Sequence, residues 1–244
     1  MIHGALLFSV LAGALAVHWM DLANPRRVKL VTAFTGAYLM ALTCLHLLPE
    51  VFGNGHHGHH HGNHAHEQPQ AILLGACVLA GFFFQVILDN FSEGIEHGHA
   101  HLHHSGTTTM MIGLCFHAFL EAMPLQHAHD SQLLLGIVIH KFPVSIVLLG
   151  MLLHQSTNRK RAYGLLGVFA IMAPLGAMVG NLPALKNLAA ILLAVVIGIF
   201  MHVSTTILFE TGEDHHYNRR KGLAILLGAV LAALGVFLMP AHAH

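Results

Sequence analysis

Three short segments place histidine next to an acidic or basic residue inside otherwise apolar stretches. The pairs are His46 with Glu50, His117 with Glu121, and His140 with Lys141. In each of the first two pairs the residues are four apart, which puts both side chains on one face of a helix. An imidazole and a carboxylate can then converge on one ion. Such ligands suit zinc first, with iron(II), manganese, cobalt and cadmium as alternatives.

The stretches that carry these residues are long enough to cross a membrane. The chain has 244 residues, of which 55% are hydrophobic and only 9% are charged. A soluble domain of this size needs more charge on its surface, so the composition predicts an all-α integral membrane protein. Runs of about 20 apolar residues predict eight transmembrane helices in a single domain covering residues 1–244. We expect them at residues 2–20, 30–49, 71–91, 107–126, 133–153, 162–180, 188–209 and 223–239.

The first run could instead be a cleaved signal peptide. It lacks a basic start and a convincing small-residue cleavage site, so we expect it to remain as a helix.

The distribution of basic residues predicts how the helices are oriented in the membrane. With eight spans, nine of the eleven lysines and arginines fall on one side, at 26–29, 159–161 and 219–221. The positive-inside rule then predicts that both termini are extracytoplasmic, in a plasma or bacterial inner membrane. The net charge of zero gives no reason to expect a nucleic-acid partner.

Two loops, at 53–68 and 97–104, are rich in histidine. The first loop, predicted to be external, contains His56, His57, His59, His60, His61, His64 and His66. The second loop, predicted to be cytoplasmic, contains His97, His99, His101, His103 and His104. Neutral imidazoles bind borderline metals weakly and exchangeably, which favours accessory metal capture. A tolerated low-complexity linker is the alternative.

Ionisable residues inside membrane-spanning helices are costly and indicate a functional site. Helical rise places His117, Glu121 and His140 at one level near the middle of the membrane. We therefore predict that these three bind the metal, with His46 assisting and Glu50 at the entrance. Each of them alone could instead form a hydrogen bond within the bundle or pair with a neighbouring charge.

Other polar residues lie toward the predicted cytoplasmic side. His202 and Glu210 share one face of the seventh span and could line an exit. Asp89, Glu93 and Glu96 close the third span, where an ordinary solvated helix end is the simplest interpretation and an exit path the alternative. Coordinating helices of transporters are often interrupted, and the candidate breaks are Pro124, Pro143 and Pro174.

At these residues the chain resembles the ZIP (Zrt/Irt-like) family of metal transporters. The segment 117–126 is similar to the family signature of histidine, small residue, two spacers, acid and small residues. His140 and Lys141 followed by Pro143 resemble the next motif, and His46 with Glu50 match a pairing of one subgroup. Residues 173–176 and 198–203 resemble segments of the sixth and seventh helices, with His202 where an aromatic residue is usual.

The resemblance implies uptake of zinc or a related ion toward the cytoplasm, without a cofactor or an enzymatic step. It also implies a site between helices four and five, helped by helix two, and a homodimer. Many members hold two metals, using an acid directly after the fifth-helix histidine and an acid or histidine further on. Lys141 and Val144 stand there in this chain. A protonated lysine cannot bind metal and could occupy the place of a second ion, which favours one metal.

Two other classes of protein could use the same residues. A membrane-embedded zinc hydrolase would activate water at the metal, but the sequence has no HExxH or GxSxG motif. A histidine-rich metal buffer or sensor would explain the loops but not the three residues within the membrane.

Overall fold

The structure, a computed structural model, describes residues 2–19, 25–53, 67–92, 107–126, 131–155, 158–209 and 219–238. All regular secondary structure in these ranges is helical. Both histidine-rich tracts lie outside them, as do three acids of the predicted exit path, Glu93, Glu96 and Glu210. The all-helical prediction is confirmed over the described part of the chain.

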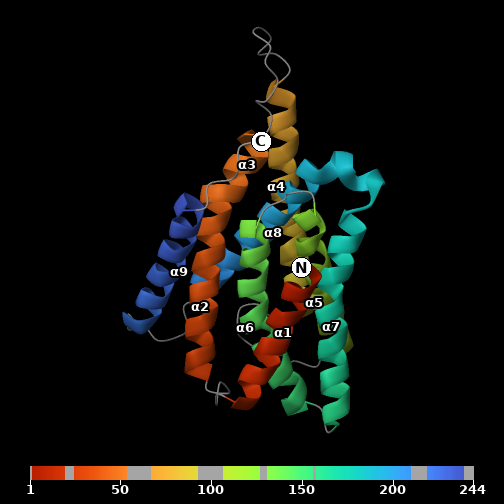
Figure 1. The fold of residues 1–244 in the computed structure, drawn as a ribbon, viewed down its shortest axis with the longest axis vertical. Helices are drawn as coiled ribbons and strands as arrows, with labels where there is room; N and C mark the ends of the chain where they lie inside the picture. Colours follow the sequence, from red (N-terminus) through yellow and green to blue (C-terminus); the bar gives the residue numbers. More distant parts are fainter. Residues whose placement is uncertain are drawn as a thin grey trace.

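Each predicted span corresponds to one helix or one stack of helical segments. The elements are α1 (Ile2–Trp19), α2 (Pro25–Leu42), η1 (Thr43–Leu47), α3 (Leu48–Gly53), α4 (Glu67–Ser92), α5 (Thr107–Ala122), η4 (Met123–Gln126), α6 (Ser131–Gln155), α7 (Arg159–Gly180), η5 (Pro183–Leu188), α8 (Ala189–Phe209) and α9 (Arg219–Leu238). Seven spans built from them are long and apolar enough to cross a membrane, and the apolar helix at the N-terminus is shorter. In Figure 1 the helices α2 and α7 begin at the lower end of the bundle, and α9 also runs upward from its first residues.

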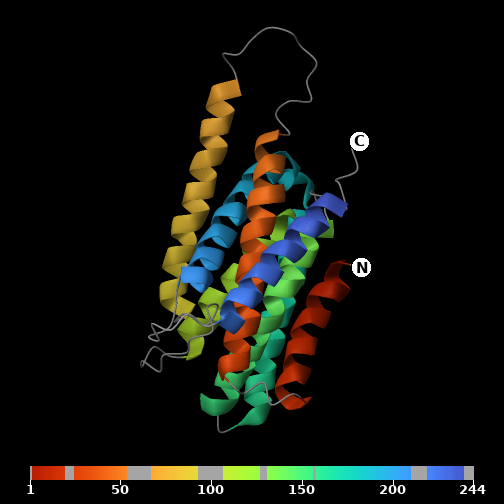
Figure 2. The ribbon, with the colours of Figure 1, turned by 90° about the vertical axis from the view of Figure 1, so that its left-hand side faces the viewer.

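The helices pack as two groups of four. In one group α1 lies along α6 and α5 along α7; in the other α2 lies along α9 and α4 along α8. Figure 1 shows α2 and α9 on the left and α1 and α7 on the right, and Figure 2 shows α4 beside α8. The groups meet chiefly where α2 packs on α6 and α4 packs on α5. The two helices that carry His117 and His140 therefore both face this junction.

Glycine brings several of these helix pairs into backbone contact. A Cβ atom on Gly198 of α8 would lie 1.9 Å from the carbonyl oxygen of Val78 in α4. A Cβ atom on Gly176 of α7 would lie 2.0 Å from the carbonyl oxygen of Phe119 in α5. Small residues allow this approach, which provides the van der Waals contact that holds helices together in lipid. These contacts fix α4 against α8 and α5 against α7.

The second span contains the main irregular segment within the described helices. Residues 43–47 form one π-helical turn, in which the Leu48 N–H donates to the Thr43 carbonyl. Pro49 has no N–H to donate to the carbonyl of Leu45, which favours the wider turn. Such turns are frequent at functional sites, and this one contains His46. This turn was not predicted from the sequence.

The expectation of proline breaks was wrong for two of the three prolines. Pro143 and Pro174 lie inside the continuous helices α6 and α7. Each removes one helical hydrogen bond, but packing against neighbouring helices maintains the helical path. Pro124 does follow the end of α5, in the 3₁₀ turn η4. It cannot donate to the Leu120 carbonyl, which explains the tightening of the last turn.

Candidate metal site

The three residues predicted to bind metal lie together in the interior. His117 and Glu121 come from α5 and His140 from α6, and each residue is at most 1% exposed. One ligand atom from each can be chosen so that all three lie within 4.8 Å of one another. The rings of His117 and His140 are nearly perpendicular, with their centroids 5.8 Å apart.

The separations suit a small cation after a modest contraction. The Nε2 atom of His117 lies 3.3 Å from Oε2 of Glu121. Two ligands of a tetrahedral zinc ion are about 3.4 Å apart, since each bond is about 2.0–2.1 Å long. The His117–Glu121 pair therefore already has the required spacing. The chosen ligand atoms of the three residues are at most 4.8 Å apart, so a contraction of at most about 1.4 Å would complete a three-ligand set.

Gln85 of α4 fixes the orientation of the His117 ring. Its Oε1 atom lies 2.9 Å from Nδ1 of His117, and its side chain is fully buried. An amide oxygen can only accept, so Nδ1 carries the proton and Nε2 is the nitrogen available to a metal. Partners of this kind set the tautomer of metal-binding histidines. Because α4 belongs to the other helix group, the site includes side chains from both sides of the junction.

Lys141 is a resident cation of the site. Its Nζ atom lies 2.5 Å from Oε1 of Glu121, and the lysine is 2% exposed. Nζ also lies 4.8 Å from the ring centroid of Phe169 in α7, a cation–π distance. A buried carboxylate needs a compensating positive charge. Lys141 supplies that charge on one oxygen of Glu121 and leaves the other directed toward His117.

The second predicted pair, His46 and Glu50, also meets. Nε2 of His46 in η1 lies 3.9 Å from Oε2 of Glu50 in α3. Their side chains are 12% and 22% exposed, well above the values at the buried cluster. The π-helical turn thus carries a partly accessible histidine–carboxylate pair.

His202 of α8 lies beside an acidic residue of α4. Its Nε2 atom lies 3.8 Å from Oδ2 of Asp89 in α4, and its ring packs edge-on against Phe82, with centroids 5.1 Å apart. The simplest sequence interpretation of Asp89 was a solvated helix end, yet its side chain is only 22% exposed. Close packing of α4 on α8 covers it. Glu210, which was predicted to line the same exit path as His202, lies outside the described residues.

Gln85 is the site residue that the sequence analysis missed. It stands as a single amide in the apolar run from 71 to 88, where a polar side chain is costly unless it has a hydrogen-bond partner. That isolation was the available signal. The residue it contacts is 32 positions away, so local spacing does not identify the pair.

A known protein family matches the part of the chain that carries the cluster. A family model described as "ZIP Zinc transporter" matches residues 99–240, more than half of the chain. The chain belongs to the ZIP family. The matched range includes α5 and α6, which carry the buried cluster. As a ZIP protein it is a multi-pass integral membrane transporter of metal ions and not an enzyme.

Curated relatives extend the similarity beyond that range. Zinc transporter ZIP9 of Micropogonias undulatus is 24% identical over 256 residues, covering 82% of this ZIP chain and 80% of that protein. Zinc transporter ZIP9-B of Xenopus laevis is 26% identical over 214 residues, covering 72% and 66%. Zinc transporter ZIP9 of Xenopus tropicalis has the same identity and coverage.

Proposed function

We propose that this ZIP protein carries zinc across the membrane toward the cytoplasm through one site formed by His117, Glu121 and His140. The observation that carries the proposal is the convergence of the three ligand atoms in a fully buried position. Two imidazoles and one carboxylate are a donor set that zinc prefers. The curated relatives are named zinc transporters, which points to the same ion.

Burial and charge support transport over storage. Placing these ionisable groups inside a helix bundle is costly, and the cost is balanced only by an ion or by pairing. The cluster lies where the two helix groups meet, with Gln85 reaching His117 from the opposite group. A metal buffer needs only exposed ligands and gives no reason for such a position.

Lys141 supports a single bound metal. Its ammonium group already occupies one oxygen of Glu121, where a second cation would otherwise bind. It has no lone pair while protonated and cannot act as a ligand. We therefore assign one zinc ion per chain to the buried cluster, with iron(II), manganese, cobalt and cadmium as weaker alternatives.

The partly accessible pair of His46 and Glu50 is assigned to the entrance. Its greater exposure suits transient capture before the ion reaches the buried ligands. His202 with Asp89 is assigned to the exit toward the basic, cytoplasmic side. The histidine-rich tracts capture metal at the two surfaces, and the family resemblance supports a homodimer.

Zinc flux into liposomes tests the assignment. The purified chain is reconstituted, and entry of zinc is followed with a trapped metal-sensitive dye. We expect saturable flux in the wild type and none in His140→Ala, because the buried set loses one of three ligands. His154→Ala is the matched control, since it removes an exposed histidine near the end of the same helix.

Two results would count against the proposal. Wild-type flux in a correctly inserted His140→Ala variant would remove the buried cluster from the transport path. Tight stoichiometric zinc binding without flux in the wild type would favour a buffer or sensor. The folded state of each variant is checked by size-exclusion chromatography in detergent.

A further inference from the structure

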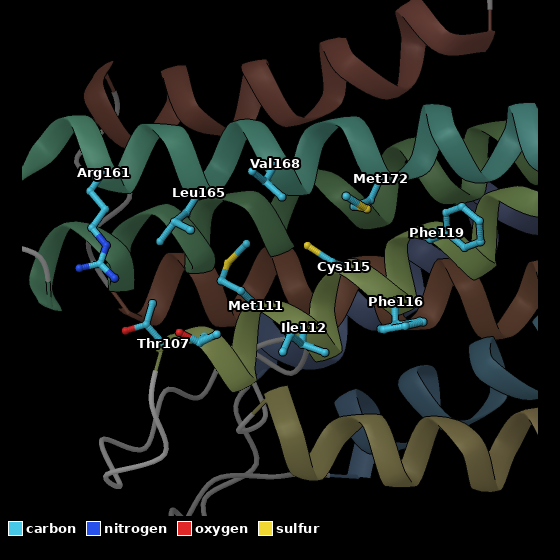
Figure 3. Close-up of a pocket in the computed structure, with 11 residues that line it drawn as sticks. Thr107, Met111, Ile112, Cys115, Phe116, Phe119, Arg161, Leu165, Val168 and Met172 are labelled. Carbon is cyan, nitrogen blue, oxygen red and sulfur yellow. The ribbon is translucent and has the colours of Figure 1, made fainter.

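A groove of about 470 Å³ runs between α5 and α7 on the outer surface of the bundle. Most of its lining is apolar, and one end is polar (Figure 3). The apolar residues are Met111, Ile112, Cys115, Phe116, Phe119, Leu165, Val168 and Met172; the polar end has Thr107, Thr108 and Arg161. Ile112, Phe116 and Val168 are each about half exposed, so the groove opens toward lipid.

Helix packing explains why the groove exists. Near its apolar end, Gly176 of α7 meets the backbone of Phe119 in α5, and Gly180 meets that of Met123 in η4. One turn below Gly176, this contact gives way to the larger side chain of Met172, which lines the groove. A groove thus follows α7 from there to its first turn, where Asn158 caps the helix by accepting from the Lys160 N–H. Arg161 is held in that first turn.

We propose that this groove binds one acyl chain of an anionic glycerophospholipid, with the lipid phosphate at Arg161. The distance along α7 from Arg161 to Met172 is eleven residues, or about 16 Å. One leaflet of a bilayer has a hydrocarbon thickness of about 15 Å. The groove therefore matches a single leaflet, with its polar end at headgroup level and its apolar end near the midplane.

Charge complementarity favours an anionic headgroup. A guanidinium group binds phosphate oxygens through paired hydrogen bonds. The groove's polar end also coincides with the first turn of α5, whose N–H groups and threonine hydroxyls favour an anion. None of the lining residues in the described part is acidic. A zwitterionic lipid would bring its own cation to this positive end and bind less well.

The predicted orientation supports the same lipid. Arg161 belongs to the basic cluster at 159–161, which the positive-inside rule assigns to the cytoplasm. The cytoplasmic leaflet is the one that carries anionic phospholipids. Anionic phospholipids are therefore available in the leaflet that faces the polar end of the groove.

Photoreactive lipids test the proposal in the full chain. The protein is reconstituted into vesicles containing either phosphatidylglycerol or phosphatidylcholine with a photoreactive group in one acyl chain, and labelled peptides are mapped by mass spectrometry. We expect phosphatidylglycerol to label the groove faces of α5 and α7 preferentially. Arg161→Ala should lower that labelling about fivefold. Leu165→Trp, which fills the groove, should lower labelling while Arg161 remains.

Arg159→Ala is the matched control. Arg159 lies two residues earlier and lines a different cavity, with His18 and Tyr163, so its removal should leave labelling of the groove unchanged. Three results would overturn the proposal. They are equal labelling by phosphatidylcholine, full labelling of Arg161→Ala, and cross-linking of this face to a second copy of the chain in place of lipid.

Discussion

Removing the resident cation should tighten zinc binding. In Lys141→Met the carboxylate of Glu121 loses the ammonium group that lies 2.5 Å from it, while the apolar stem of the side chain is largely preserved. Breaking one side of a buried ion pair costs about 3 kcal/mol or more, because the remaining charge is left uncompensated. Zinc can supply the missing charge and recover that energy. In the wild type it gains less, since the carboxylate is already compensated.

The expected magnitude follows from that difference. If zinc recovers about 3 kcal/mol in the variant, its affinity rises about a hundredfold, at 1.4 kcal/mol per factor of ten. The gain in zinc affinity should be largest at mildly alkaline pH, where protons compete less with zinc for the carboxylate of Glu121. Without metal, the variant should be less stable than the wild type, and zinc should remove most of the difference.

Competition titrations with a chelating dye measure the affinity, and melting in detergent with zinc or with chelator measures the stability. Lys186→Met is the matched control, because it removes one positive charge from an exposed position in η5. Its zinc affinity should equal that of the wild type. Unchanged or weaker zinc binding in Lys141→Met would refute the view that the lysine and the metal share one carboxylate. An equal loss of stability with and without zinc would refute it as well.

Three further outcomes are expected. Gln85→Leu should weaken zinc binding about 10- to 100-fold in dye competition, because the amide no longer orients the ring of His117. Gln132→Leu, at another buried glutamine, should leave zinc affinity unchanged. Gly198→Ala should destabilise the fold by about 1–3 kcal/mol, because the added Cβ meets the backbone of α4, whereas Gly167→Ala, with open space around it, should not alter melting in detergent. Deleting residues 56–66 should raise the zinc concentration needed for half-maximal uptake into liposomes without ending transport; complete inactivity of the folded deletion would contradict an accessory role.

Local spacing was sufficient to predict most of the fold and the core of the candidate site. Apolar run length depends on neighbouring residues alone, so each predicted span has a counterpart in the described helices. The i, i+4 pairing of His117 and Glu121 is likewise a local property of one helix. His140 was added by comparing the membrane depth of residues on two consecutive spans that cross in opposite directions. The structure brings these three together.

Contacts that depend on which helices pack together could not be predicted in this way. Gln85 reaches His117, and Asp89 meets His202, only because α4 packs on both α5 and α8. Nothing in the spacing of a single segment encodes that neighbourhood. The continuity of α6 through Pro143 has the same origin, since tertiary packing there outweighs the local preference for a break.

The resident lysine gives a physical reason why a buried carboxylate and two histidines can suit transport as well as binding. A transport site must take up its ion and then release it, so very tight binding would slow turnover. With Lys141 on one oxygen, Glu121 remains compensated when the site holds no metal, and the bound ion has to share the carboxylate. Both effects lower the energy difference between the occupied and the empty site. Under the proposed function, Lys141 therefore sets zinc affinity at a level compatible with release.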